Sequence, residues 1–219
     1  MHFRDRREAG KLLGCRLHNE SFVDPVVLGL PRGGVPVAYE VALVLGAPLE
    51  AFVARKVGAP GHEEFGIGAI AEGSDELVVT ESAWTLGLSS QEIAALAARE
   101  GVELKRRVEQ YRGGAPLPEL GGRDVVLVDD GLATGVTAEA AVRSLRQRNP
   151  RRLIVAVPVC APDTARRLAA IADHVVCLAA PTEFHAVGLW YEDFAATSDA
   201  EVRDLLRRAH ATANTGASR

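Results

Sequence analysis

The 219-residue sequence has few cysteines and no long apolar run. Its three cysteines, Cys15, Cys160 and Cys177, lie far apart and form no Cys-x-x-Cys pair. This spacing predicts neither a disulfide framework nor a zinc site, so we expect reduced thiols in the cytoplasm. No stretch approaches the roughly 18 apolar residues that a membrane-spanning helix needs. The charged segment Met1–Glu8 is not typical of a signal peptide, so we expect no membrane partner.

An excess of positive charge is also missing. The formal net charge is −4 and the sequence pI is about 5.9, which argues against a protein dedicated to binding nucleic acid. Aromatic residues make up only 5% of the chain, but hydrophobic residues as a whole reach 47%. A chain of this length and composition can bury a large core, and that excludes disorder along its whole length.

Apolar residues, many of them β-branched, gather in short runs without polar alternation, as expected of strands that are buried on both faces. These runs are residues 26–30, 49–54, 77–80, 125–128, 153–157 and 174–178. Helical patterns lie between them at residues 36–45, 137–148 and 162–171. The alternation predicts an α/β fold, with a mostly parallel sheet and helices on both of its faces.

Residues 73–122 interrupt this alternation, and we interpret them as a helical insertion near the mouth of the sheet. Ser89 and Glu92 have the spacing of a capping box, which marks the start of a helix. Gly101 is expected to weaken or break that helix. We expect one domain over residues 1–210, followed by a tail at 211–219 whose small, polar residues predict disorder.

The most informative segment is residues 125–137, in which four apolar residues lead to Asp129 and Asp130 and then to a turn with glycine and threonine. The carboxyl ends of parallel strands form binding crevices, and the N-terminus of the next helix attracts anions. Residues 134–137 can therefore hold a phosphate, while the two carboxylates suit a partner that donates hydrogen bonds, such as a ribose diol. Two acids can also simply end a strand and cap a helix, but their combination with this turn favours a binding site.

The motif resembles the phosphoribosyl diphosphate (PRPP) motif of the type I phosphoribosyltransferases, in which a hydrophobic strand, two acids and a short turn lead to Thr-Gly-x-Thr. The resemblance covers roughly residues 20–195 and implies the fold of that family, with a small hood over the sheet. It implies that Asp129 and Asp130 hold the ribose hydroxyls of PRPP. It also implies a loop for the 5-phosphate, formed by Gly131, Leu132, Ala133, Thr134, Gly135, Val136 and Thr137.

Ala133 stands where the 6-oxopurine enzymes of that family have an acid, so the motif is more similar to that of the adenine enzymes. The acceptor remains unidentified at this point.

A second segment fits the same resemblance. Arg32, Gly33 and Gly34 follow the predicted strand 26–30, where the family has a diphosphate loop that often contains a non-proline cis peptide. The glycines allow the backbone to approach an anion, and Arg32 supplies positive charge. An ordinary glycine turn with a solvated arginine is the alternative, and the motif downstream favours the diphosphate loop.

Residues 55–68 contain four glycines and a proline, and we interpret them as a mobile lid. The resemblance implies that such a lid closes over the reacting centre, with Lys56 as a catalytic residue that reaches the diphosphate. Glu64 is a candidate for proton transfer with the acceptor, although a solvated loop acid is equally compatible with its position.

The resemblance further implies a hood built from segments near the N-terminus and at about residues 181–196. Trp190, Tyr191 and Asp193 could contact a flat acceptor there. Close aromatic residues also suit simple packing, so both interpretations stay open.

The implied activity is transfer of the phosphoribosyl group of PRPP to a small-molecule acceptor, such as a nucleobase, with release of diphosphate. Mg²⁺ is expected to enter on PRPP and not on a dedicated set of protein ligands. Two other functions stay open: a non-catalytic PRPP- or nucleotide-binding regulator, and a metal-dependent phosphohydrolase. The insertion could shape the acceptor site or the interface of a homodimer.

Overall fold

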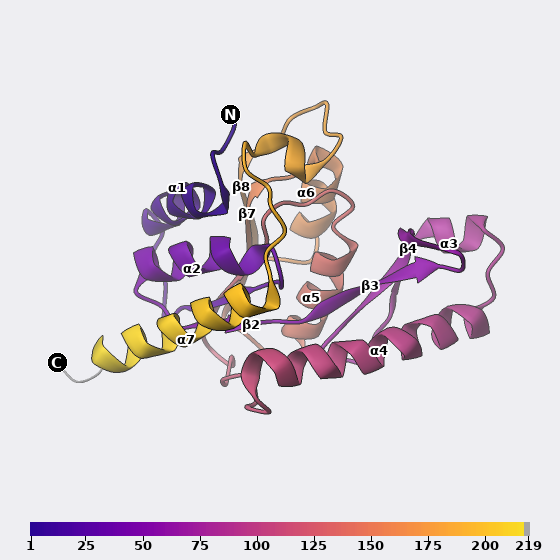
Figure 1. Cartoon of the computed structure of the whole chain (residues 1–219), viewed down its shortest axis with the longest axis horizontal. Helices are drawn as coiled ribbons and strands as arrows, with labels where there is room; N and C mark the ends of the chain where they lie inside the picture. Colours follow the sequence, from indigo (N-terminus) through magenta and orange to yellow (C-terminus); the bar gives the residue numbers. More distant parts are fainter. Residues whose placement is uncertain (217–219) are drawn as a thin grey trace.

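A five-stranded parallel sheet forms the centre of the molecule (Figure 1). The computed structural model describes residues 1–216, except for the side chains of residues 63–64 and 213–216. The strand order is β2-β1-β6-β7-β8, and the strands are β1 (Val26–Gly29), β2 (Leu49–Ala51), β6 (Asp124–Val128), β7 (Arg152–Val159) and β8 (His174–Ala179). β1 pairs in register with β6, so that Gly29 lies opposite Val128 at the carboxyl ends of both strands. The predicted parallel sheet is confirmed.

Helices cover both faces of this sheet (Figure 1). Strand side chains of one alternate set, including Val126 and Ile154, are buried against α1 (Arg6–His18), α2 (Gly34–Leu45) and α7 (Asp199–Gly216). The other set, which includes Leu127 and Val155, is buried against α5 (Val136–Arg146) and α6 (Pro162–Ala169). Burial on both faces explains why these strands are apolar without alternation. The predicted α/β class is confirmed.

Helix α1 is an element that the apolar pattern does not reveal. It begins after Asp5, whose carboxylate accepts a hydrogen bond from the amide of Glu8 at 2.7 Å. Gly10 allows α1 to lie directly on α2, because a Cβ atom at Gly10 would stand 2.7 Å from the carbonyl oxygen of Val37. Beside its buried glycines, α1 buries two large apolar side chains on this face, Leu13 and Leu17, and this sparse pattern leaves little hydrophobic signal in the sequence.

A second, antiparallel sheet projects beside the first (Figure 1). It consists of β3 (Ala54–Ala59), β4 (His62–Ala71) and the short β5 (Val78–Val79). The segment that we interpreted as a mobile lid is thus a β-hairpin. Val57 and Ile67 on this hairpin are fully buried, and the pairing of β3 with β4 shifts register around Gly58. The glycines of this segment accommodate an irregular hairpin, where sequence analysis interpreted them as loop residues.

The insertion contains α3 (Glu81–Thr85) and the long α4 (Ser90–Arg112). The capping box at Ser89 and Glu92 is confirmed, since each side chain bonds the backbone of the other residue. Gly101 does not break α4, contrary to expectation. Buried residues on both sides of it, Ile93 and Leu104, hold the helix together, and their burial outweighs the roughly 1 kcal/mol cost of a helical glycine.

The C-terminal helix corrects another expectation. α7 continues through residues 211–216, which were expected to belong to a disordered tail. Alanine is the best helix former, and alanines recur at positions 209, 211 and 213. Residues 217–219 of the expected tail lie outside the described residues. Within residues 1–216, no helix is long and apolar enough to cross a membrane.

An ion pair between Arg112 and Glu72 fastens α4 to the core. Both side chains are less than one-tenth exposed, and Arg112 also donates to the carbonyl oxygen of Ala51 at 2.9 Å. The Glu72 carboxylate accepts a further hydrogen bond from the amide of Val53 at 2.6 Å. The pair therefore connects the end of α4, the end of β2 and the segment after β4.

We expect Arg112→Met to lower the free energy of unfolding by about 3 kcal/mol, because it leaves the buried Glu72 carboxylate without its cation. Arg112→Met combined with Glu72→Gln should recover part of this loss. The matched control is Arg106→Met, whose side chain is 56% exposed and whose removal should change the free energy of unfolding far less, because solvent screens its ion pair. Urea denaturation measures all three, and equal losses for Arg112→Met and the control would contradict the anchoring role.

Candidate functional site

Two carboxylates and two glycines meet where β1 and β6 end. Asp129 and Asp130 follow β6 directly, and the turn after β1 leads through Gly33 and Gly34 into α2. A Cβ atom at Gly33 would stand 2.0 Å from Oδ2 of Asp130, and one at Gly34 would stand 2.7 Å from the carbonyl oxygen of Val128. Only glycine fits at these two positions, so the structure brings the expected diphosphate turn into contact with the expected diol acids.

The turn has one unusual bond. The peptide between Pro31 and Arg32 is cis, a feature that the resemblance implied for this loop. Arg32 is exposed, and the amide of Gly34 donates to the carbonyl oxygen of Leu30 at 3.0 Å. The positively charged side chain therefore lies at the carboxyl edge of the sheet, beside the start of α2.

The expected 5-phosphate loop, residues 131–137, connects the acids to α5. Gly135 precedes the first residue of α5 with a φ of +67°, and a Cβ atom there would stand 2.3 Å from the Thr164 methyl group. The hydroxyl of Thr164 donates to the carbonyl oxygen of Ala133 at 2.5 Å, and Arg167 donates to that of Thr134 at 2.5 Å. The carbonyl side of the loop thus faces α6. The first amides of α5 have no partner within the helix, and its dipole favours an anion there.

The two segments expected to build a hood, one near the N-terminus and one at about residues 181–196, lie against each other. Phe3 and Tyr191 pair their backbones, the amide of Asp193 donates to the carbonyl oxygen of Arg4 at 2.8 Å, and the ring of His2 stacks on Trp190 at 5.2 Å. These contacts place the start of the chain against the segment that contains the short helix η1 (Val187–Trp190). Trp190 and Asp193 stay candidates for acceptor contacts.

Tyr191 has a different position from the one expected of an acceptor contact. Its ring is buried between Phe3 and Phe194, and its hydroxyl donates to the carbonyl oxygen of Asp130 at 2.6 Å. Burial raises the pKa of the Tyr191 hydroxyl far above its usual value, so it stays a hydrogen-bond donor. The side chain supports the acid pair from the hood side.

Arg6, from the first turn of α1, bonds the acid pair directly. Its Nε lies 2.8 Å from Oδ2 of Asp130, and the two side chains are only 11% and 15% exposed. Its guanidinium also lies 3.9 Å from the ring centroid of Phe194 and donates to the carbonyl oxygen of Ala195 at 2.7 Å. Arg6 therefore connects the hood to the carboxylate that the resemblance assigns to the ribose.

The acid pair is costly to keep ionised. Burial raises the pKa of Asp129 well above its ordinary value, and repulsion from Asp130 raises it further. Burial also raises the pKa of Asp130, against the opposing effect of Arg6. The amide of Asp130 donates to Oδ1 of Asp129 at 2.8 Å. Perturbed pKa values at a crevice are typical of functional sites.

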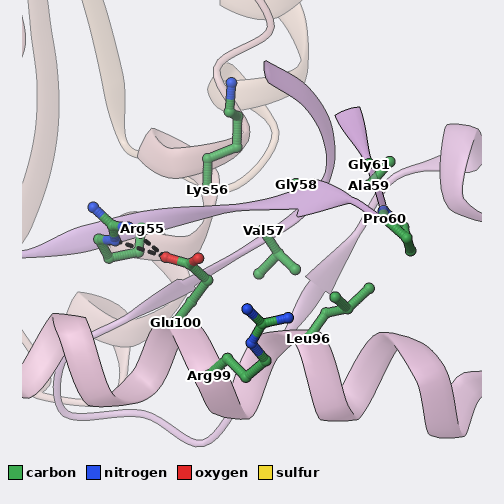
Figure 2. A pocket seen from close by; sticks show the side chains of 10 residues that line it. All are labelled: Arg55, Lys56, Val57, Gly58, Ala59, Pro60, Gly61, Leu96, Arg99 and Glu100. Carbon is green, nitrogen blue, oxygen red and sulfur yellow. Dashed lines mark hydrogen bonds and ion pairs between the residues drawn. The ribbon is translucent and has the colours of Figure 1, made fainter. Parts of the chain in front are cut away.

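The hairpin residues Lys56 and Glu64 are not brought into a described contact with the acids. Figure 2 shows that Lys56 on β3 points away from α4, whereas Val57 points towards it. A cavity of about 320 Å³ lies on the α4 side and is bordered by the Arg55–Glu100 ion pair, whose atoms are 2.5 Å apart. Glu64 lies in β4, and its side chain is outside the described part of the chain. Both residues stay predictions.

A family model described as a phosphoribosyl transferase domain matches residues 9–192. The chain belongs to the phosphoribosyl transferase family. Two curated proteins of Mycobacterium tuberculosis, from strains CDC 1551 and H37Rv, carry phosphoribosyl transferase in their names, and each is 45% identical over 208 residues. These matches cover 95% of this chain and 47% of each relative, so the chain spans about half the length of those proteins.

Solved structures agree on the fold of this family member. The crystal structure of TT1426 from Thermus thermophilus is 48% identical, with a TM-score of 0.79 over 95% of this chain and 99% of that one. The AQ2163 protein from Aquifex aeolicus is 15% identical, with a TM-score of 0.52 over 92% and 83% of the two chains. The second likeness concerns the fold alone.

Three side chains of the candidate site were not identified from the sequence: Arg6, Thr164 and Arg167. The last two follow β7, the neighbour of β6, and the rule that parallel strands end at one edge of the sheet could have indicated them. Arg6 reaches the acids only because α1 and the hood fold over them. No local pattern around Arg6 indicates this contact.

We expect Asp129→Asn to raise the free energy of unfolding at pH 7. A raised pKa means that the folded state binds the Asp129 proton more tightly than the unfolded chain does, so the wild-type protein loses stability as the pH rises through that pKa. Asparagine carries no charge. The stability that Asp129→Asn gains over the wild type should therefore shrink as the pH falls towards 3.8, the ordinary pKa of an aspartate. Denaturant titrations at several pH values, with exposed Asp204→Asn as the control, measure the difference. A variant less stable than wild type at pH 7 would contradict this account.

Arg6→Met should have the opposite effect at pH 7. It leaves the Asp130 carboxylate without its cation, at a cost of about 3 kcal/mol in the free energy of unfolding. The loss should become smaller in acid, where Asp130 takes up a proton. Arg16→Met on the same helix is the control, because that side chain is 54% exposed and should contribute less than about 1 kcal/mol. A loss that does not change with pH would argue against the pairing with Asp130.

Proposed function

We propose that the chain transfers the phosphoribosyl group of PRPP to a small-molecule acceptor, with release of diphosphate and with the help of Mg²⁺. The observation that carries this proposal is the contact between the Gly33–Gly34 turn and the Asp129–Asp130 pair. The segments that we assign to the diphosphate, the ribose diol and the 5-phosphate then lie at one edge of the sheet, which supports binding of all parts of one PRPP molecule.

The acids suit the ribose hydroxyls in number and in chemistry. Protein bonds already use Oδ1 of Asp129 and Oδ2 of Asp130, and the second oxygen of each carboxylate serves as an acceptor for one hydroxyl. Carboxylates that accept from two adjacent hydroxyls form charge-assisted bonds, each contributing about 1.5–3 kcal/mol. A ribose diol is uncharged, so its binding adds no negative charge beside two carboxylates that already repel each other.

The two loops suit the anionic ends of the substrate. The start of α5 offers amides and the hydroxyls of Thr134 and Thr137 to the 5-phosphate. Arg32 and the backbone at Gly33 and Gly34 face the diphosphate, on which negative charge builds as its bond to the sugar breaks. Fixed positive groups at that place stabilise the transition state more than the ground state.

We expect Mg²⁺ to enter this site bound to PRPP. Among the side chains that the structure describes, no group of three or more histidines, cysteines or acids lies together as a metal site. Mg²⁺ usually keeps several waters and binds through phosphate oxygens of its substrate. It would therefore enter on the diphosphate of PRPP, while Asp129 and Asp130 accept the ribose hydroxyls, and it would neutralise charge on the leaving diphosphate when bound.

Calorimetric titration with PRPP in the presence of Mg²⁺ tests the binding site. We expect saturable binding to the wild-type chain, and a loss of at least about 100-fold in affinity for Asp129→Asn combined with Asp130→Asn, since two charge-assisted bonds are removed. The control combines Asp24→Asn with Asp204→Asn, which changes the net charge equally at two exposed acids. Normal binding by the first double variant would overturn the site.

Turnover is tested separately, by release of diphosphate from PRPP with a panel of nucleobases and amines. Release that depends on both an acceptor and Mg²⁺ supports the transferase. Binding of PRPP without turnover on any acceptor would instead support a regulatory role, and metal-dependent phosphate release from simple esters would support a phosphohydrolase.

A further inference from the structure

Cys160 and Cys177 lie against each other beneath the phosphate loop. Their sulfur atoms are 2.7 Å apart, although sequence analysis treated the cysteines as distant from one another. The two residues belong to neighbouring parallel strands: Cys160 follows β7 directly, and Cys177 lies within β8. The crossover through α6 brings them together, which spacing in the sequence does not reveal.

The surroundings of the two sulfur atoms differ in a way that suits thiol chemistry. Cys160 is fully buried, whereas Cys177 is partly exposed, so a reagent from solvent meets Cys177 first. The hydrogen bond between the thiols lowers the pKa of Cys160 and raises that of Cys177. Cys160 is therefore the sulfur that more readily becomes the attacking thiolate.

The backbone around Cys160 also holds the phosphate loop. The carbonyl oxygen of Val159 accepts from the amide of Leu132 at 2.9 Å, and the amide of Ala161 donates to the carbonyl oxygen of Leu132 at 2.8 Å. These two bonds lie on either side of Cys160, while the amide of Cys160 itself donates to the carbonyl oxygen of Ala179 in β8 at 3.0 Å. The two neighbours of Cys160 in the chain thus hold both backbone groups of Leu132.

We propose that Cys160 and Cys177 form a reversible disulfide, a redox modification site that fixes the phosphate loop to β8. The oxidant is a small disulfide such as oxidised glutathione. Its S–S bond breaks as the Cys177 sulfur forms a mixed disulfide, and one glutathione thiol is released with the Cys177 proton. The Cys160 thiolate then attacks the Cys177 sulfur, the protein disulfide forms, and the second glutathione leaves as a thiolate that takes up the Cys160 proton.

The effect on the loop rests on the proposed function. A covalent link at Cys160 restricts the movement of the segment that positions Leu132. A phosphate loop that is fixed before binding loses less conformational freedom when the phosphate enters. The oxidised protein is therefore expected to bind PRPP more tightly than the reduced protein.

The test uses the full chain with Cys15→Ser, because Cys15 is exposed and would itself react with glutathione. This protein is equilibrated in buffers with increasing ratios of oxidised to reduced glutathione, then alkylated and examined by intact mass and peptide mapping. We expect both remaining thiols to disappear together, with loss of two hydrogens and a cross-linked peptide that contains Cys160 and Cys177. Two alkylated thiols throughout, or a stable glutathione adduct at Cys177, would overturn the proposal.

Variants that lack one of the two cysteines distinguish a specific Cys160–Cys177 disulfide from unspecific oxidation of thiols. Cys15→Ser with Cys160→Ser should form only a mixed disulfide at Cys177, and Cys15→Ser with Cys177→Ser should keep a protected thiol at the buried Cys160. A cross-link in either variant would be intermolecular and would contradict the intramolecular bond.

Calorimetry with PRPP and Mg²⁺ then compares the reduced and oxidised Cys15→Ser proteins. We expect tighter binding by about threefold or more after oxidation, equivalent to somewhat less than 1 kcal/mol. Equal affinities would overturn the link to the phosphate loop. If neither form binds PRPP while the disulfide still forms, the proposed function fails and the modification site stands.

Discussion

The register between β1 and β6 is the constraint on which the site depends. With Gly29 opposite Val128, both strands end at the same level, and the turn after one strand meets the acids after the other. The contact is so close that a single methyl group at Gly33 would collide with Asp130. The two glycines after β1 thus leave the space that the two carboxylates after the neighbouring strand β6 occupy. The conformation of each loop therefore depends on the other loop.

The acid pair also explains how the hood is attached. Two half-buried carboxylates repel each other, and Arg6 offsets part of that repulsion from within α1. Tyr191 adds a bond to the backbone of Asp130 from the other hood segment. The unfavourable charge of the acid pair is therefore also what attracts Arg6, and Arg6 in turn contacts Phe194 and Ala195 of the hood.

The sheet could be predicted from the sequence because its strands are buried on both faces, which leaves uninterrupted apolar runs such as 125–128 and 153–157. The turn that leads from the acids into α5 and the capping box at Ser89 could be predicted because their signals are local. The hairpin at 54–71 could not, since its glycines resemble a loop until β4 is seen to pair with β3. Helix α1, Arg6 and the Cys160–Cys177 pair depend on contacts between distant segments, and local patterns contain no trace of them.

The pairing of Phe3 with Tyr191 sets the order in which the molecule can be completed. A chain is made from its N-terminus, so Phe3 and Arg6 leave the ribosome about 190 residues before their hood partners do. At ordinary rates of synthesis this interval is about 10–40 s. Asp130 itself is made 61 residues before Tyr191, so for about 3–12 s of that time it lacks the support of Tyr191. The site therefore matures late, only after the hood segment around Tyr191 has been made.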